Sequence, residues 1–177
     1  APFRPMPRSA RPAAATPVRA PSALTAACTC GRLRRAARSL TQLYDDAMAP
    51  SGLRITQFSL VRTLAREGPM RISDVASMLL LDRTALSRNI EPLLARGLVS
   101  LTTGRDARTR VAAITRAGEA AFAAAEPHWR RAQAAVARKL GRERLDALIG
   151  VLGELEALHP DLHVPFAAPP AHAAAGR

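Results

Sequence analysis

The sequence predicts a mainly α-helical fold that is interrupted once, by a short β-hairpin. Aromatic residues make up 3% of the 177 residues, and alanine and leucine dominate the 48% that is hydrophobic, a mixture that favours helix packing over sheet packing. Apolar residues recur at helical spacing through most of the chain between two proline-rich ends. The pattern changes only around residues 99–114, where short Val-, Thr- and Ile-bearing runs indicate strands.

Four helices are expected before the hairpin, each with an apolar face at helical spacing. The first covers about 31–48 and is followed by proline and glycine, which end helices. The other three begin at side chains whose oxygen can accept the free N–H groups of a first turn. These capping residues are Thr56, Ser73 and Asp82.

The hairpin is expected to pair Val99–Thr103 with Arg110–Ile114 around a basic tip. Two long Ala- and Leu-rich helices follow, at about 116–138 and 142–158. Pro127 lacks a backbone N–H and clashes with the preceding turn, so we expect it to interrupt or kink the first of them.

The net charge of the chain is strongly positive. Lysine and arginine total 26 against 14 aspartates and glutamates, a formal charge of +12, and Lys139 is the single lysine. Such a balance suits a polyanionic partner, because each neutralised phosphate releases counterions. A basic, solvated surface without that role is the alternative, so charge alone leaves nucleic acid as one of two interpretations.

Several other classes of protein are not indicated. No stretch approaches the ~18 apolar residues needed to cross a membrane, and the N-terminal residues lack the continuous apolar segment of a signal peptide. We therefore expect a cytoplasmic protein. The sequence has no phosphate loop, no nucleophile elbow and no His, Asp and Cys group at catalytic spacing, so we expect no enzyme, no cofactor and no metal site.

Two helices joined by a tight turn and followed by a basic hairpin form, in outline, a winged helix-turn-helix with a two-stranded β-wing. The second helix of such a fold must present short polar and basic side chains at its N-terminal end to reach base edges in the major groove. Thr84, Ser87 and Arg88 share one face of that helix. Arginine can bind guanine, and asparagine adenine, through two parallel hydrogen bonds. The expected DNA contacts are Arg83, Thr84, Ser87, Arg88, Asn89, Arg105, Arg108 and Arg110.

The hairpin contributes the last three of these contacts. A narrow minor groove concentrates negative potential and attracts guanidinium groups, so Arg105, Arg108 and Arg110 are expected to enter it. Asp106 is expected to organise the wing by a bidentate pair with Arg108. An amphipathic surface helix and an ordinary charged turn would explain the two features separately. Their order and spacing together favour a DNA reader.

The same residues resemble the MarR (multiple antibiotic resistance regulator) family over about 28–158. Three motifs carry the resemblance: the family's recognition helix leading into the wing, the D-x-R of the wing tip, and the L-T-x-x-G that opens the next helix. A departure lies in the turn of the helix-turn-helix, where the family commonly has a glycine. Residues 82–88 with 93–99 resemble the recognition helix and its lead into the wing, Asp106-Ala107-Arg108 the wing tip, and residues 114–118 the start of the next helix. The departure is Leu80-Leu81.

The resemblance implies a triangular homodimer that reads a pseudo-palindromic operator, with repression as the family default. Residues 51–115 would form the winged helix-turn-helix DNA-binding domain, and 28–50 with 116–158 the helical dimerisation region. The apolar residues of the terminal helices agree, because one small winged domain cannot cover them all. The Pro- and Arg-rich arm 1–27 and the tail 159–177 are expected to be disordered.

Members of the family release DNA when an oxidant or a small molecule acts. The spacing of Cys30 and Tyr44 resembles the organic hydroperoxide resistance regulators, whose reactive cysteine is held by tyrosines; the other expected tyrosine position is Arg34. The resemblance thus implies a redox sensor at Cys30 with Tyr44. In the alternative, Cys28 and Cys30 are small packing residues.

The second possible trigger is a small aromatic or phenolic effector. Arg38, His128 and Trp129, with Tyr44, are the polar or aromatic residues that could line its pocket. Trp129 is alternatively a core or dimer-interface residue. The alternative to a sequence-specific regulator is an architectural protein that binds DNA without sequence preference. Evenly spread arginines and a poorly formed recognition helix would favour this alternative.

Overall fold

A computed structural model of the chain describes residues 28–104 and 109–159. The expected arm 1–27, the hairpin tip 105–108 and residues 160–177 of the expected tail lie outside the described residues. The chain divides into two compact units, Ala1–Arg38 and Ser39–Arg177, which are described separately.

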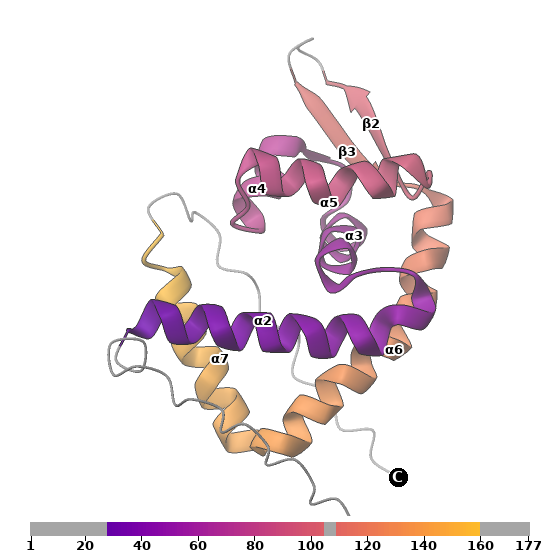
Figure 1. Cartoon of the computed structure of the whole chain (residues 1–177). Coiled ribbons are helices and arrows are strands. Elements are labelled where there is room, and N and C mark those ends of the chain that lie inside the picture. Colours follow the sequence, from indigo (N-terminus) through magenta and orange to yellow (C-terminus); the bar gives the residue numbers. More distant parts are fainter. Residues whose placement is uncertain (1–27, 105–108, 160–177) are drawn as a thin grey trace, which may run out of the picture. The chain divides into compact units, whose positions relative to one another are not determined.

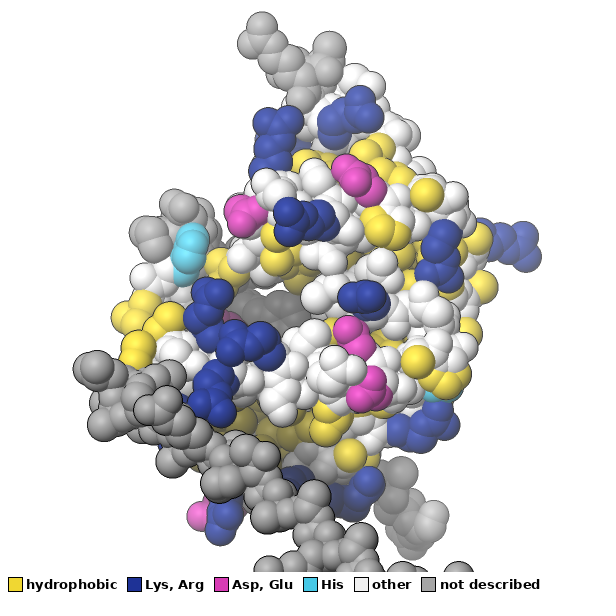
Figure 2. Space-filling model, in the orientation of Figure 1, with side chains coloured by type: hydrophobic (Ala, Val, Ile, Leu, Met, Phe, Trp, Pro, Cys, Tyr) yellow, Lys and Arg dark blue, Asp and Glu magenta, His cyan; other side chains and the backbone are white. Residues whose placement is uncertain are grey.

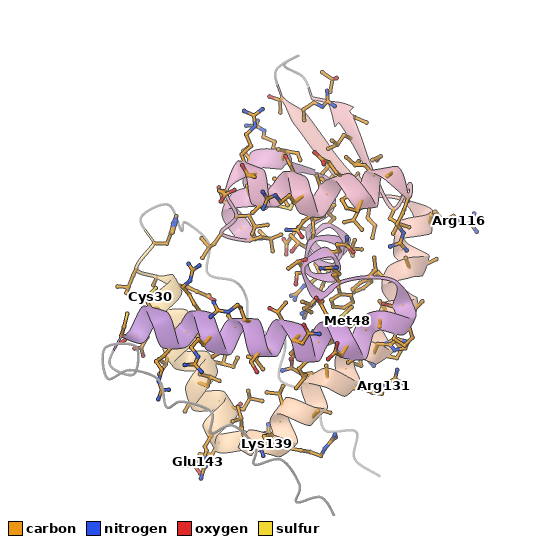
Figure 3. All side chains as sticks on the ribbon, viewed as in Figure 1. Cys30, Met48, Arg116, Arg131, Lys139 and Glu143 are labelled. Carbon is orange, nitrogen blue, oxygen red and sulfur yellow. The ribbon has the colours of Figure 1, made fainter. Side chains whose placement is uncertain are left out.

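The described part of the first unit is the beginning of helix α2 (Thr29–Met48), which confirms the helix expected at 31–48. The sulfur of Cys28 accepts the backbone N–H of Gly31 at 3.4 Å and so occupies the position of a helix cap. Cys30 lies in the first turn of α2 (Figure 3). Both cysteines are exposed, free thiols.

The second unit begins with the remainder of α2, which passes into a 3₁₀ turn, η1 (Ala49–Ser51). Gly52 then adopts a left-handed conformation (φ 68°), which glycine tolerates without strain. Helix α3 (Ile55–Glu67) follows. The Asp45 carboxylate near the end of α2 accepts the N–H of Ile55 at 2.7 Å, so α2 holds the start of α3 directly.

Two of the three expected caps are wrong. Helix α3 starts one residue before Thr56, with Arg54 as its N-cap, because the Gln57 side chain accepts the Arg54 N–H at 3.1 Å. Helix α4 (Ile72–Met78) starts one residue before Ser73, whose hydroxyl bonds the neighbouring carboxylate of Asp74 instead. In both cases the first turn forms without the expected hydroxyl.

The third expected cap is confirmed. The Asp82 carboxylate accepts the N–H of Ala85 at 2.7 Å and begins helix α5 (Arg83–Ala95), which runs through Pro92. Helix α6 (Arg116–Leu140) likewise continues through Pro127, so the expected interruption does not occur. Ala125 and Ala132 of α6 are buried on either side of that proline, and this packing holds the helix together across the missing hydrogen bond.

The hairpin is confirmed and belongs to a slightly larger sheet. Strands β2 (Val99–Thr103) and β3 (Arg110–Ile114) pair antiparallel, with Val99 opposite Ile114 and Thr103 opposite Arg110. A third strand, β1 (Met70–Arg71), pairs with the other edge of β3, giving the order β1-β3-β2. Two residues are too few to produce a detectable alternation in the sequence, so β1 was not expected.

The hydrophobic core lies between α3, α5, α6 and the sheet (Figure 1). Phe58 of α3 is at its centre and stacks on Phe122 of α6, with ring centroids 5.3 Å apart. The last helix, α7 (Arg142–Glu156), has no buried residue, and Ile149 and Val151 are about half exposed. The other large core side chains are Met48, Leu53, Leu60, Val61, Leu64, Val75, Leu86, Ile90 and Leu93.

Replacing Asp82 with alanine removes the cap of α5 and leaves the Ala85 N–H without its carboxylate partner. We expect a loss of about 1 kcal/mol in the free energy of unfolding, measured by urea denaturation. Asp82→Asn, which keeps an acceptor oxygen, is the control and should lose less. Equal stability of the alanine variant and the wild type would contradict the capping role.

Candidate nucleic-acid interface

Helices α4 and α5 form the helix-turn-helix, and the turn between them is tight. Leu80 in this turn has a φ of 49° and is the single non-glycine residue with positive φ among those described. Such a conformation is disfavoured for a branched-chain residue, whereas glycine adopts it without strain. The departure seen in the sequence therefore leaves the turn in place, with a leucine in the glycine conformation.

Helix α5 presents its expected reading residues to solvent. Its inner face buries Leu86, Ile90 and Leu93 against the core. On the opposite side, Arg83, Thr84 and Arg88 are exposed and Ser87 is partly exposed. The helix is thus oriented so that its N-terminal half can meet a DNA groove.

Asn89 is less available than its neighbours. Its side-chain amide donates to the Ala85 carbonyl oxygen at 2.9 Å, four residues earlier in the same helix. An asparagine that reads adenine needs both its donor and its acceptor free. The Asn89 side chain must therefore release this bond before it can make such a contact.

The wing is described up to its tip. The Gly104 N–H donates to the Thr109 carbonyl at 2.8 Å and closes the base of the tip. Arg110 begins β3 and is exposed. Arg105, Asp106 and Arg108 lie outside the described residues, so the expected pair between Asp106 and Arg108 stays a prediction.

The cations around α5 are not neutralised by acids. Within the described ranges, the ion pairs are Arg130 with Glu126 on α6 and Arg142 with Asp146 on α7. Figure 2 shows basic side chains spread over the face that carries α5, with acidic side chains lying among them, although neither Arg83 nor Arg88 is in one of these ion pairs. Arg83 and Arg88 are therefore available for phosphates or base edges.

Sequence reasoning missed one further cation near this surface. Arg71 is exposed, precedes the first turn of α4 and is placed by β1, where it pairs with Val111 of β3. The two-residue strand that positions it carries no periodic signal. The basic residue directly before the first helix of the helix-turn-helix was the one available indication.

The residues expected to sense an effector lie in several surroundings. Cys30 and Arg38 are exposed on the part of α2 that belongs to the first unit. In the second unit, the Tyr44 hydroxyl donates to the side-chain oxygen of Gln133 on α6, and burial raises the pKa of Tyr44. His128 bonds the guanidinium of Arg131, which is labelled in Figure 3.

Trp129 packs against the core, as its alternative interpretation held. Its ring stacks on Phe58 with centroids 5.9 Å apart, and the Arg62 guanidinium lies 4.7 Å above it. Burial, and secondarily the neighbouring Arg66, lowers the pKa of Arg62. Sequence reasoning missed Arg62 because this contact joins α3 to α6.

The part of the chain that the structure describes holds no group of three or more His, Cys, Asp or Glu residues placed to bind a metal ion. No helix in the described ranges is long and apolar enough to span a membrane.

Comparisons with known proteins agree with this geometry. A model of the MarR family matches residues 51–109, from the start of the winged region into the hairpin. The crystal structure of the transcriptional regulator MosR of M. tuberculosis in complex with DNA is 39% identical, with a TM-score of 0.65, over 74% of this chain and 97% of that one. This chain belongs to the MarR family. No curated protein matches it.

Other MarR-like structures support the fold. The transcriptional repressor CouR bound to a 23-mer DNA duplex is 24% identical, with a TM-score of 0.68, over 75% of this chain and 95% of that one. The PcaV regulator from Streptomyces coelicolor, in complex with its natural ligand, is 16% identical with the same TM-score, over 75% and 94%. As a MarR family member, this chain is a DNA-binding transcription regulator with a winged helix-turn-helix.

Proposed function

We propose that this MarR family chain acts as a homodimer that reads a pseudo-palindromic operator and represses transcription until an effector releases it. The orientation of α5 carries the proposal: the helix buries Leu86 and Ile90 and exposes Thr84 and Arg88. Among the described residues, Arg88 forms no ion pair with a carboxylate. MosR, 39% identical, is a transcriptional regulator in complex with DNA.

In this proposal α5 enters the major groove with its N-terminal half. Arg88 binds a base edge through two parallel hydrogen bonds, while Thr84 and Ser87 contact bases or backbone beside it. Arg83 and Arg110 contact phosphates or the neighbouring minor groove, and the tip residues Arg105 and Arg108 extend the same contact.

The dimer is supported by the apolar residues of α7. No side chain of this helix is buried within one chain, and Ile149, Val151 and the following Leu158 are 46%, 51% and 77% exposed. A second copy that covers them would bury this surface by a symmetric contact. In a two-fold dimer that reads an operator, the two copies of α5 are expected about one turn of DNA apart, roughly 10 bp.

Selection from a random duplex library tests the proposal. We expect the wild-type protein to enrich two inverted half-sites, and sedimentation to show two chains per selected duplex. Equal affinity for all sequences, lost at moderately increased salt concentration, would instead favour an architectural protein that binds DNA through its +12 charge.

A small aromatic acid is one proposed effector. Arg62 lies over the Trp129 ring, and within the described ranges its neighbour Glu126 pairs with Arg130. A carboxylate beside Arg62 would therefore meet a partly desolvated cation next to an aromatic surface. Tyr44 and His128 remain proposed lining residues, and the role of Arg38, which belongs to the first unit, stays a prediction from the sequence. The structure of the repressor CouR bound to p-coumaroyl-CoA, at 23% identity, supports a search for an effector of this class.

An oxidant is the other proposed effector, acting at Cys30. A peroxide transfers one oxygen to the Cys30 sulfur, giving a sulfenic acid, and leaves as the alcohol or water. The exposed thiols of Cys28 and Cys30 support access by peroxide. Tyr44 remains the proposed partner of Cys30, although its hydroxyl is bound to Gln133.

We expect Cys30→Ser to abolish the release of DNA by organic hydroperoxide in a gel-shift titration. Cys28→Ser is the matched control, since it changes the neighbouring thiol, and it should keep the response. Both variants should bind DNA like the wild type in the absence of peroxide. A response that persists in Cys30→Ser would remove this residue from the mechanism.

A further inference from the structure

The junction between the end of α5 and the start of α6 is unusually tight. The Thr115 hydroxyl donates to the Gly97 carbonyl oxygen at 2.7 Å and accepts the Gly118 N–H at 3.0 Å. The Thr115 backbone N–H donates to the Leu98 carbonyl at 3.1 Å. One residue therefore caps α6 and binds the segment that leaves α5. We call the contact among Gly97, Leu98, Thr115 and Gly118 the α5–α6 clasp.

Gly118 leaves no room at the clasp for a side chain. A Cβ atom added there would overlap the Leu98 carbonyl oxygen and approach the side chain of Ile114 to 2.8 Å. Gly118 is buried in the first turn of α6. The backbone of α6 therefore lies directly on the peptide that follows α5, and a larger residue would force the two apart.

A second contact holds the same end of α5 from another side. The Arg96 guanidinium, at the C-cap of α5, donates to the Gly52 carbonyl oxygen at 2.8 Å in the turn before α3. The N-terminal end of α5, by contrast, follows the turn at Leu80 and has the local cap from Asp82. The hydrogen bonds that tie α5 to distant elements are thus gathered at its C-terminal end.

The clasp and the Arg96 bond fix the C-terminal end of α5, while Leu86 and Ile90 pack the helix on the core. From Arg83 to Ala95, α5 spans roughly 18 Å at about 1.5 Å per residue. A tilt of about 10° at the clasp would move the reading end by roughly 3 Å, close to the ~3.4 Å that separates neighbouring base pairs. The separation of two reading helices in a dimer therefore depends on how α5 is held against α6.

We infer that Thr115 and Gly118 are positioning residues that set the half-site spacing which the dimer accepts. The inference rests on the proposed function, because spacing has meaning only for two copies on one operator. These residues need not touch DNA: they fix the direction in which α6 presents α5. The α5 side chains determine which base sequence is read in each half-site, and the clasp sets the distance between the half-sites.

The test is selection of bound duplexes from a random library by the wild type, Thr115→Val, Thr115→Ser and Gly118→Ala. Valine keeps the shape of threonine and loses both hydroxyl bonds, whereas serine keeps them. Thr63→Val is the matched control, because it removes a buried hydroxyl that bonds Ser59 within α3, away from the clasp. Arg96→Ala removes an exposed contact and serves if the other variants fail to fold.

We expect the wild type, Thr115→Ser and Thr63→Val to select one spacing. Thr115→Val, Gly118→Ala and, more weakly, Arg96→Ala should select the same half-site over several spacings. Their preference for the wild-type spacing over one changed by a base pair should fall by about tenfold. Weaker binding with unchanged spacing in all three variants would overturn the inference. A wild type that selects no sequence would instead overturn the proposed function.

Discussion

Replacing Arg88 with alanine is expected to weaken binding to the selected operator by about 1–3 kcal/mol per half-site, the largest effect of any single side chain on α5. Arg88 is exposed on the reading face and has no carboxylate within ion-pair distance in the described part of the chain. A bidentate contact with guanine is lost as a unit, since alanine replaces neither hydrogen bond. Discrimination at one base pair should relax at the same time.

Titrations on operator and random duplexes at several salt concentrations measure this effect. Arg116→Ala is the matched control: it removes an equal charge from the first turn of α6, where the side chain points away from the rest of the protein (Figure 3). That variant should change operator preference little. If Arg88→Ala weakened all sequences equally and lowered the salt slope, Arg88 would be a phosphate contact and not a base reader.

Replacing Phe58 with alanine is expected to lower the free energy of unfolding by about 3–5 kcal/mol, the largest effect on stability. Phe58 is 1% exposed and its ring stacks on both Phe122 and Trp129, at 5.3 and 5.9 Å between centroids. Alanine would leave a cavity between α3 and α6 and remove both stacks. The Arg62 guanidinium above Trp129 would lose the support of that ring as well.

Urea denaturation of the purified protein, at fixed concentration because a dimer is proposed, checks this value. Phe122→Ala is the comparison, since Phe122 is only partly buried and stacks on Phe58. It should lose clearly less stability. Equal losses in the two variants would place the centre of the core elsewhere than at Phe58.

Local patterns in the sequence predicted most of the fold. The hairpin strands were found at the residues where the structure has them, because their register depends on a nearby turn. The cap at Asp82 was found for the same reason, since its partner Ala85 is three residues away. The cap at Thr56 failed because Asp45, ten residues before Ile55, and Gln57 hold the start of α3. The cap at Ser73 failed because its hydroxyl bonds Asp74 and α4 begins one residue earlier.

The candidate site divides in the same way. The reading face of α5 followed from helical spacing, since Thr84, Ser87 and Arg88 recur on one side. The contacts of Arg62 with Trp129 and of Tyr44 with Gln133 join helices far apart in the sequence, and no spacing rule brings them together. The motif at 114–118 indicated the start of a helix, and its spacing does not indicate that Thr115 also binds Gly97 after α5.

Footprinting on the DNA upstream of the protein's own gene, at physiological salt, tests whether the protein reads a specific operator. We expect a protected site with two-fold symmetry at low protein concentration, which Arg88→Ala loses and Arg116→Ala keeps. Diffuse protection that disappears with a modest increase in salt would contradict it, since the +12 charge would then bind DNA without reading its sequence.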